Sequence, residues 1–237
     1  MAFEKVAIIL ALFITTTGVL GEHMPDTTRN GERENLVAKT IEKRGISDPE
    51  VLRAMRAVHR HRFVPEDYLG LAYSDRPLPI GHEQTISQPY IVALMIQELG
   101  LGGNEKVLEI GAGSGYNAAV LAEVAEEVYT IEIVGELAEW SGNALKKAGY
   151  SNVHVKHADG YFGWPGMEFD VVIITAAANH VPHPLIEQLK DGGRIILPLS
   201  SPAGFQALTL ITKAGENLDT RIITGVRFVP MTGRMLE

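Results

Sequence analysis

The sequence of 237 residues contains no cysteine and no run of lysine or arginine. The absence of cysteine excludes disulfides, thiolate metal sites and a cysteine nucleophile. Eight histidines are present, but none stands in an H-E-x-x-H or other metal-ligand spacing. The formal net charge is −8 and the isoelectric point about 5.5, whereas a surface that binds duplex nucleic acid is basic. We therefore expect neither a bound metal nor a nucleic-acid partner.

The length suits one α/β domain with an added subdomain. Residues 6–20 form an apolar run after a lysine, with small residues near Gly18 and Gly21, which resembles the apolar region of a secretory signal. The run is too short to predict a membrane span. Alternatively, translation starts at Met24, because the rest of the chain is typical of a cytosolic cofactor enzyme. We expect a cytoplasmic protein, with export or membrane anchoring through residues 1–23 as the alternative.

The most informative stretch is residues 106–133, KVLEIGAGSGYNAAVLAEVAEEVYTIEI. It predicts a buried strand, a glycine-rich turn, a helix and a second strand, at residues 107–110, 111–115, 116–125 and 128–131. Glycines permit positive φ and let a ligand approach the backbone, and a helix start offers free N–H groups. Glu132 follows the second strand, where a carboxylate can accept hydrogen bonds from both hydroxyls of a ribose.

The glycine spacing separates two ligands that suit this unit. A dinucleotide site has the pattern G-x-G-x-x-G, whereas this chain has Gly111, Gly113 and Gly115, with Tyr116 where the third dinucleotide glycine would stand. The stretch E-I-G-A-G-S-G instead resembles the first motif of the class I methyltransferases, whose loop passes the methionine part of S-adenosyl-L-methionine. A glycine-rich turn without a ligand is the remaining alternative.

Two helices are predicted before this unit, over residues 32–44 and 48–59. A basic cluster at the second helix indicates either a phosphate site or, as we favour because acidic residues lie close by, a solvated helix face. It comprises Arg53, Arg56, His59, Arg60, His61 and Arg62. A third helix is predicted to reach about Leu99, with Ser87 as its N-cap and Pro89 in its first turn.

Residues 62–65, RFVP, and 72–90, AYSDRPLPIGHEQTISQPY, closely resemble the N-terminal region of the protein-L-isoaspartate (D-aspartate) O-methyltransferases. The resemblance continues through residues 157–160 to 226–232 and covers about residues 34–232. Two departures stand out: Ala158 replaces a glycine, and only five residues follow Thr232, where many relatives continue further. The short end puts in doubt any substrate contact that the extension makes.

This resemblance implies an α/β fold: a class I S-adenosylmethionine-dependent methyltransferase (Rossmann-like) sheet with helices on both faces, plus an N-terminal helical subdomain. We expect a helical and substrate-loop region at 24–100 and a methyltransferase core with C-terminal substrate strands at 101–237. Beyond the two strands above, apolar runs predict further strands at 153–156, 171–175, 192–198, 206–212 and 222–228, and a short helix at 184–189.

The implied reaction moves a methyl group from S-adenosyl-L-methionine to the free α-carboxyl of L-isoaspartyl and D-aspartyl residues and starts repair through a succinimide. Such a carboxylate is ionised at neutral pH, so the step needs alignment and desolvation, and it needs no general base. The implied partners are isoaspartyl peptides and proteins, and we expect a monomer.

By resemblance Ser87 is the catalytic residue, with plain helix capping as the alternative. The implied substrate-binding residues are Thr85, Ile86, Val181, Pro182, Val229 and Thr232, although Val181 and Val229 also suit plain packing. The implied cofactor-binding residues are Gly111, Gly113, Glu132, Asp159 and Gly160, with a turn role as the alternative for Asp159. Covalent catalysis by Ser87 is rejected because no histidine stands in an activating pattern.

Four rival functions follow from the same residues. A nucleic-acid N-methyltransferase is disfavoured, because residues 175–178 read TAAA where such enzymes carry (N/D)-P-P-(Y/F), and because the chain is acidic. A nicotinamide-dependent oxidoreductase is disfavoured by the glycine spacing. A class I methyltransferase for another carboxylate, and a non-catalytic isoaspartyl-binding adaptor, stay open.

Overall fold

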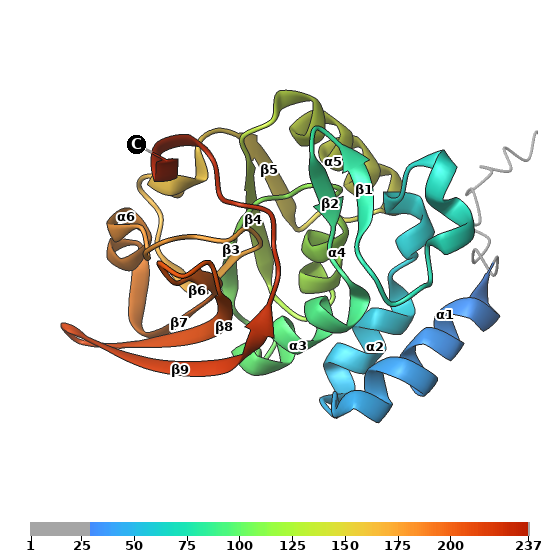
Figure 1. Cartoon of the computed structure of the whole chain (residues 1–237), viewed down its shortest axis with the longest axis horizontal. Helices are drawn as coiled ribbons and strands as arrows, with labels where there is room; N and C mark the ends of the chain where they lie inside the picture. Colours follow the sequence, from blue (N-terminus) through green and yellow to red (C-terminus); the bar gives the residue numbers. More distant parts are fainter. Residues whose placement is uncertain (1–28, 237) are drawn as a thin grey trace, which may run out of the picture. The chain divides into compact units, whose positions relative to one another are not determined.

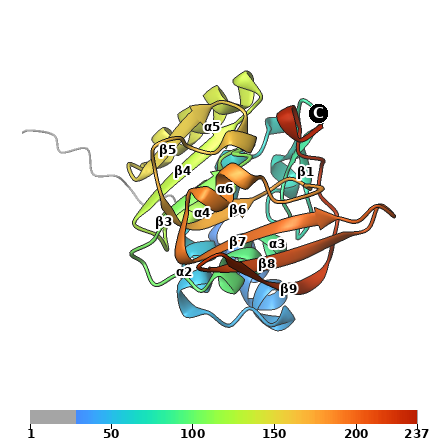
Figure 2. The ribbon, with the colours of Figure 1, turned by 90° about the vertical axis from the view of Figure 1, so that its left-hand side faces the viewer.

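A seven-stranded sheet in the order β5-β4-β3-β6-β7-β8-β9 forms the centre of the computed structural model, which describes residues 29–236 (Figure 1). The strands are β3 (Lys106–Ile110), β4 (Glu127–Glu132), β5 (Val153–His157), β6 (Phe169–Ile174), β7 (Leu189–Ser200), β8 (Gln206–Ala214) and β9 (Asn217–Val226). Strands β3 to β7 are parallel, and β8 and β9 are added antiparallel. In Figure 2 the orange and red β7, β8 and β9 form a long antiparallel ribbon. All seven predicted strands are present.

The strand order reverses beside β3. From β3 the chain adds β4 and then β5 on one side, whereas β6 and then β7 are added on the other side. In open α/β sheets a ligand binds at such a reversal, outside the carboxyl ends of the strands. The ends of β3 and β6 therefore mark the place to look for a site.

Alternating side chains of the strands supply two hydrophobic cores. Val107 and Ile173 face the larger core, which is covered by α3 (Pro89–Leu99), α4 (Tyr116–Ala122) and α5 (Gly135–Ala148). Leu108 and Ile174 face the smaller core, which contains Leu185 of α6 (His183–Glu187) and two methionines of the C-terminal segment. Both faces of the parallel strands are apolar because helices or the C-terminal segment bury both. The predicted sheet with helices on both faces is confirmed.

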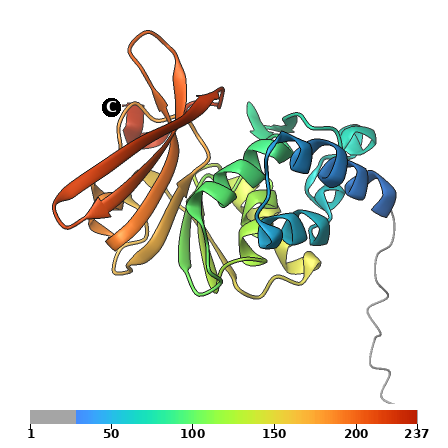
Figure 3. The ribbon, with the colours of Figure 1, turned by 90° about the horizontal axis from the view of Figure 1, so that it is seen from below.

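The N-terminal helices pack onto the larger core side. They comprise α1 (Asn30–Leu36), a π turn (Val37–Ile41), a 3₁₀ turn (Glu42–Arg44) and α2 (Pro49–Ala57), and α2 contacts α3 and α4 (Figure 3). Asp48 caps α2 by accepting from the N–H groups of Glu50 and Val51, with Pro49 in the first turn. The predicted helix over 32–44 is thus helical throughout, but only its first part is α-helix.

The sequence predicts that the basic cluster is a solvated helix face, and Arg60 departs from this prediction. Arg60, in a 3₁₀ turn (Arg60–Phe63), is fully buried, and its guanidinium donates to the carbonyls of Ala72 and Arg76 and lies 4.7 Å from the centre of the Tyr116 ring. A guanidinium suits this role because its several donors can bind carbonyls while its plane meets an aromatic face. Burial lowers the pKa of Arg60 to about 10.

The prediction that Ser87 caps the third helix is wrong. The N-cap of α3 is Gln88, and no side chain of the cap residue binds the helix start. The carboxylate of Asp75 does so instead, because its Oδ1 accepts from the N–H of Tyr90 at 2.9 Å. Pro89 sets the first turn, so the helix begins one residue later than the cap prediction requires.

A hairpin precedes α3. Its strands, β1 (Leu78–Gly81) and β2 (Gln84–Ile86), are antiparallel and are joined by His82 and Glu83, both at positive φ. Between the hairpin and the preceding turns lies the 3₁₀ segment Glu66–Leu71, and shorter 3₁₀ turns follow at Gly160–Phe162 and Gly233–Leu236.

Three further sequence predictions concern the end of α4, the N-terminal apolar run and the division of the chain. The helix predicted over 116–125 ends at Ala122. The apolar run 6–20 lies outside the described residues, and among the residues described no helix has the length and apolarity of a membrane span. The proposed division at residue 100 stays a prediction, and the described residues from Gly31 onward form one compact unit.

Candidate active site

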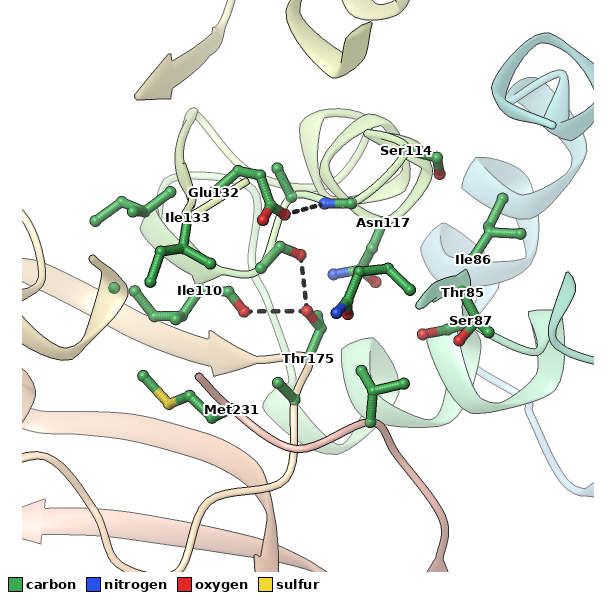
Figure 4. Close-up of a pocket in the computed structure, with 18 of the residues that line it drawn as sticks. Thr85, Ile86, Ser87, Ile110, Ser114, Asn117, Glu132, Ile133, Thr175 and Met231 are labelled. Carbon is green, nitrogen blue, oxygen red and sulfur yellow. Dashed lines mark hydrogen bonds between the residues drawn. The ribbon is translucent and has the colours of Figure 1, made fainter. Parts of the chain in front are cut away.

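A cavity lies at the carboxyl ends of β3 and β6, where the strand order reverses. Figure 4 shows its lining side chains converging from separate parts of the chain. They come from residues 84–87, 92, 110–114, 116–117, 131–133, 160, 175–176 and 229–232. The sheet topology therefore brings together the glycine-rich turn, the hairpin before α3 and the C-terminal segment.

Gly111 turns the chain at the end of β3. Its φ is +96°, and an added Cβ would lie 2.5 Å from the Thr175 hydroxyl oxygen. That hydroxyl donates to the carbonyls of Ile110 at 3.0 Å and Gly111 at 2.7 Å. Glycine is therefore needed here for its backbone conformation and for the close approach of Thr175. The expected positive φ is present at Gly111, and the close approach of Thr175 is an additional reason for glycine.

Glu132 lies at the tip of β4 and is 5% exposed. Its Oε2 accepts from the N–H of Gly113 at 2.8 Å (Figure 4). Its Oε1 accepts from the N–H of Val134 at 3.0 Å. Each carboxylate oxygen keeps a further lone pair for a hydroxyl donor. The two backbone bonds hold the carboxylate at the wall of the cavity.

A buried polar network stands behind the glycine-rich turn. Glu109, in β3, is fully buried and accepts from Asn117 Nδ2 at 2.7 Å and from the Thr130 hydroxyl at 2.5 Å. Burial raises the pKa of Glu109 to about 7, and the nearby Glu132 charge also raises it, while the two hydrogen bonds oppose the shift. Asn117, 8% exposed, lies in the cavity lining.

A second cavity adjoins the first. It is lined by Tyr90 and neighbouring residues of α3, by residues 204–206 at the β7–β8 turn, and by residues 223–229 of edge strand β9 and beyond. The residues that line both cavities are Thr85, Ser87, Thr175 and Val229. The two cavities therefore meet at three hydroxyl groups and one apolar side chain.

The backbone around Ser87 is fixed by Asp75. The two carboxylate oxygens of Asp75 accept from the N–H of Tyr90, from Gln88 Nε2 at 2.8 Å and from Arg44 Nη1 at 2.7 Å. Gln88 follows Ser87 directly, so these bonds position the start of α3 relative to the cavities. The motif A-Y-S-D-R-P thus supplies a carboxylate that supports the T-I-S segment.

Nine of the predicted site residues lie in the lining of the first cavity. They are Thr85, Ile86, Ser87, Gly111, Gly113, Glu132, Gly160, Val229 and Thr232. Gly160 is needed for packing as well, because an added Cβ would lie 2.3 Å from the Ile110 side chain.

Three predicted residues lie outside both cavity linings. The carboxylate of Asp159 accepts from the N–H groups of Tyr161 at 2.9 Å and Arg234 at 2.8 Å, which is a turn role. Val181 packs against the smaller core, and Pro182 is the N-cap residue of α6.

Two polar residues of the cavity lining, Asn117 and Thr175, are not among the predicted site residues. Asn117 sits in an alanine-rich helix start, and Thr175 was predicted as the last residue of a strand. A polar residue at each of these places, where the strand order reverses, is the signal that could have found them. Among residues 29–236 no cluster of His, Asp and Glu could hold a metal ion.

Comparisons with known proteins agree with this geometry. Residues 31–236 match the family described as Protein-L-isoaspartate(D-aspartate) O-methyltransferase (PCMT). The chain is 54% identical over 206 residues to "Protein-L-isoaspartate O-methyltransferase 2" of Shewanella sediminis, covering 86% of this chain and 84% of that protein. It is 51% identical over 208 residues to "Protein-L-isoaspartate O-methyltransferase" of Opitutus terrae, covering 87% of this chain and 89% of that protein.

Solved structures give the same result. A protein-L-isoaspartate O-methyltransferase structure matches with a TM-score of 0.79 and 32% identity, covering 86% of this chain and 67% of that one. A second structure is described as a protein-L-isoaspartate O-methyltransferase from Plasmodium falciparum in complex with S-adenosyl-L-homocysteine. It matches with a TM-score of 0.74 and 26% identity, covering 84% of this chain and 98% of that one. The family match over residues 31–236 includes the hairpin, the cavity lining and the C-terminal segment, and this chain belongs to the protein-L-isoaspartate(D-aspartate) O-methyltransferase family.

Proposed function

We propose that this chain transfers the methyl group of S-adenosyl-L-methionine to the free α-carboxyl of L-isoaspartyl and D-aspartyl residues in damaged proteins. The backbone nitrogen of the next residue then attacks the ester carbonyl and displaces methanol, which gives a succinimide, and repair begins. The observation that carries the proposal is the meeting of two cavities at Thr85, Ser87, Thr175 and Val229. One cavity suits the cofactor, and the other, beside edge strand β9, suits a peptide.

The residues of the first cavity fit the cofactor. When bound, the cofactor supplies a transferable methyl group on a sulfonium centre. Glu132 offers carboxylate lone pairs to the ribose hydroxyls, and the turn from Gly111 to Gly113 leaves its backbone open beside the methionine part. Gly160 lines the adenine side, and Asp159 fixes the turn around it.

The chemistry needs no proton acceptor. A peptide α-carboxylate has a pKa of about 3.5 and is ionised at neutral pH. Thr85 and Ser87 can donate hydrogen bonds that orient this carboxylate without cancelling its charge, as a lysine or arginine would in part. No histidine occurs among the described residues that line either cavity, so nothing there activates Ser87 as a covalent nucleophile.

The side chains around the place where the two cavities meet also suit a peptide carboxylate. Ile86, Val229 and Thr232 border the place where the carboxylate would enter, and Ile86 is buried. Apolar walls exclude water, which strengthens every hydrogen bond to the carboxylate. We further propose that the chain acts as a monomer in the cytoplasm on isoaspartyl peptides and proteins.

The proposal is tested by incubating the purified chain with S-adenosyl-L-methionine and an isoaspartyl peptide, followed by mass spectrometry over time. We expect a methyl ester, then a succinimide, with one S-adenosyl-L-homocysteine per ester. Peptide binding without ester formation would instead identify a non-catalytic adaptor. Esterification of simple carboxylic acids at the same rate as the isoaspartyl peptide would identify a methyltransferase for another carboxylate.

A further inference from the structure

A buried arginine joins the loop before β1 to the start of α4. The guanidinium of Arg60 donates from Nε to the carbonyl of Ala72 at 2.9 Å and from Nη2 to the carbonyl of Arg76 at 3.4 Å. Its Cζ lies 4.7 Å from the centre of the Tyr116 ring, and Tyr116 is the first residue of α4. Tyr116 is among the residues that line the first cavity, whereas Arg60 lines neither cavity. Arg60 can therefore act on the site only through its partners.

Stability alone does not account for this arginine. No ion pair joins Arg60 to a carboxylate within residues 29–236, and its Nη1 is buried there without a hydrogen-bond partner. Burial lowers the pKa of Arg60 to about 10, so the side chain is still a cation at neutral pH. Replacing a buried charged group by apolar side chains of similar volume is often neutral or stabilising. The geometry that the guanidinium imposes on its partners is therefore its more informative property.

The two carbonyls that Arg60 binds lie on either side of Asp75 in the chain. One belongs to the third residue before Asp75 and the other to the residue after it, so the guanidinium fixes both ends of the segment 72–76. The Asp75 carboxylate in turn accepts from Gln88 Nε2 at 2.8 Å, and Gln88 directly follows Ser87. A continuous path of contacts thus leads from the start of α4 through Arg60 and Asp75 to the segment that carries Ser87.

We propose, resting on the function proposed above, that Arg60 is a positioning residue for methyl transfer. It holds the loop that carries Asp75 against the start of α4 and so sets Ser87 relative to the first cavity. A planar guanidinium, with donors along its edges and a face on an aromatic ring, fixes this spacing better than a flexible ammonium does. A reacting group misplaced by about 1 Å can cost roughly a hundredfold in rate. Loss of Arg60 should therefore lower turnover and leave cofactor binding in place.

The test compares Arg60→Met, which has no donor, with Arg60→Lys, which keeps the charge. Turnover of an isoaspartyl peptide is expressed per cofactor site, and the sites are counted by calorimetric titration with S-adenosyl-L-homocysteine well below the melting temperature. We expect kcat per site to fall about tenfold to a hundredfold in Arg60→Met and at least about threefold in Arg60→Lys. Affinity for S-adenosyl-L-homocysteine should change less than about threefold.

A purely structural arginine would give a different result. Its loss would reduce the number of titrated sites and leave turnover per site unchanged, and that outcome would overturn the inference. If Arg60→Met fails to fold, Arg60→Lys decides alone, and parental turnover per site in Arg60→Lys would overturn the inference as well. Failure of the parent chain itself to esterify the peptide would instead overturn the proposed function.

Arg56→Met is the matched control. Arg56 lies on α2, forms ion pairs with Glu34 and Glu42, and lines neither cavity. Its loss should leave turnover per site at the parental value. An equal fall in Arg56→Met and Arg60→Met would show a general effect of removing an arginine from this region, and would contradict a specific role for Arg60.

A double-mutant cycle tests the path through Asp75. If Arg60 acts on Ser87 through Asp75, the losses from Arg60→Met and Asp75→Asn overlap. The double variant should then be no more than about threefold slower per site than the slower single variant. Losses that multiply would show that the two residues act independently, and would overturn the proposed path.

Discussion

Ser87 stands where the two cavities meet, and the residue after it caps α3. Because Ser87 does not cap the helix, Ser87→Ala should change the free energy of unfolding by less than about 0.5 kcal/mol, as for ordinary substitutions away from a cap. Turnover of an isoaspartyl peptide should fall about tenfold to a thousandfold, the loss typical of one positioned donor. Thermal melting and methylation rates check both parts.

The matched variant Ser87→Asp separates charge from size. A second carboxylate would repel the substrate carboxylate, so turnover should fall below that of Ser87→Ala. Affinity for S-adenosyl-L-homocysteine should change less than turnover in both variants. A stable Ser87→Ala protein with parental turnover would remove Ser87 from the reaction.

Glu132 is expected to bind the ribose. Glu132→Ala removes a charge-assisted hydrogen bond and should weaken cofactor binding by roughly 1.5–3 kcal/mol. The variant also loses the acceptors of the Gly113 and Val134 N–H groups, so Glu132→Gln, which keeps one acceptor oxygen, is the control for the fold. Calorimetric titration with S-adenosyl-L-homocysteine measures the loss. Unchanged affinity in a folded Glu132→Ala protein would place the ribose elsewhere.

The raised pKa of Glu109 makes the free energy of unfolding depend on pH. Its pKa is raised from 4.5 to about 7 by burial, so its stabilising contribution is full below pH 4.5 and is lost as the pH rises through 7. Glu109→Gln keeps the size and one acceptor oxygen but does not titrate. The free energy of unfolding of the parent, measured against that of the variant, should fall by roughly 3 kcal/mol between about pH 4 and pH 8. A pH-independent difference in urea titrations would contradict the buried carboxylate.

At the scale of elements, Asp75 connects the loop before β1 to the start of α3. Asp75→Asn should weaken its charge-assisted bonds to the Tyr90 N–H, Gln88 and Arg44, and should cost about 1–3 kcal/mol of stability. Because these bonds position the segment that carries Ser87, turnover should fall as well, with cofactor affinity retained.

The cap of α2 provides the control for Asp75. Asp48→Ala also removes a carboxylate from a helix start, but α2 does not line either cavity. It should cost about 0.5–2 kcal/mol of stability and leave turnover intact. Urea melts and methylation rates of both variants decide the matter, and equal turnover in the two would show that Asp75 only stabilises the fold.

The strands were the most predictable elements, because each is an apolar run bounded by polar or glycine residues. The helix ends were harder. Ser87 before Pro89 has the residue type of a cap, but the carboxylate of Asp75, distant in the sequence, supplies the acceptor. Arg60 lies in a basic cluster that suggests a solvated face, yet its carbonyl partners at Ala72 and Arg76 draw it into the core. The cap of α3 and the burial of Arg60 both depend on residues distant in the sequence, so local sequence patterns could not predict them.

At the scale of the whole molecule, the topology of the sheet determines where the site lies. Ile110 and Thr175 are 65 residues apart in the chain, and the Thr175 hydroxyl donates to the Ile110 carbonyl because β3 and β6 are adjacent. The glycine-rich turn and Glu132 could be predicted because they belong to one βαβ unit. The meeting of the two cavities could not, because it depends on β9, the hairpin before α3 and the C-terminal segment lying at one place.

The central claim is that a peptide carboxylate meets the methyl donor where the two cavities join. The most direct measurement is kcat/KM for methylation of an isoaspartyl peptide and of its aspartyl isomer. The two differ by one methylene in the placement of the carboxylate, and a displacement of about 1 Å can cost roughly a hundredfold in rate. The account predicts a preference of at least about a hundredfold for the isoaspartyl peptide. Equal values for the two peptides would contradict it.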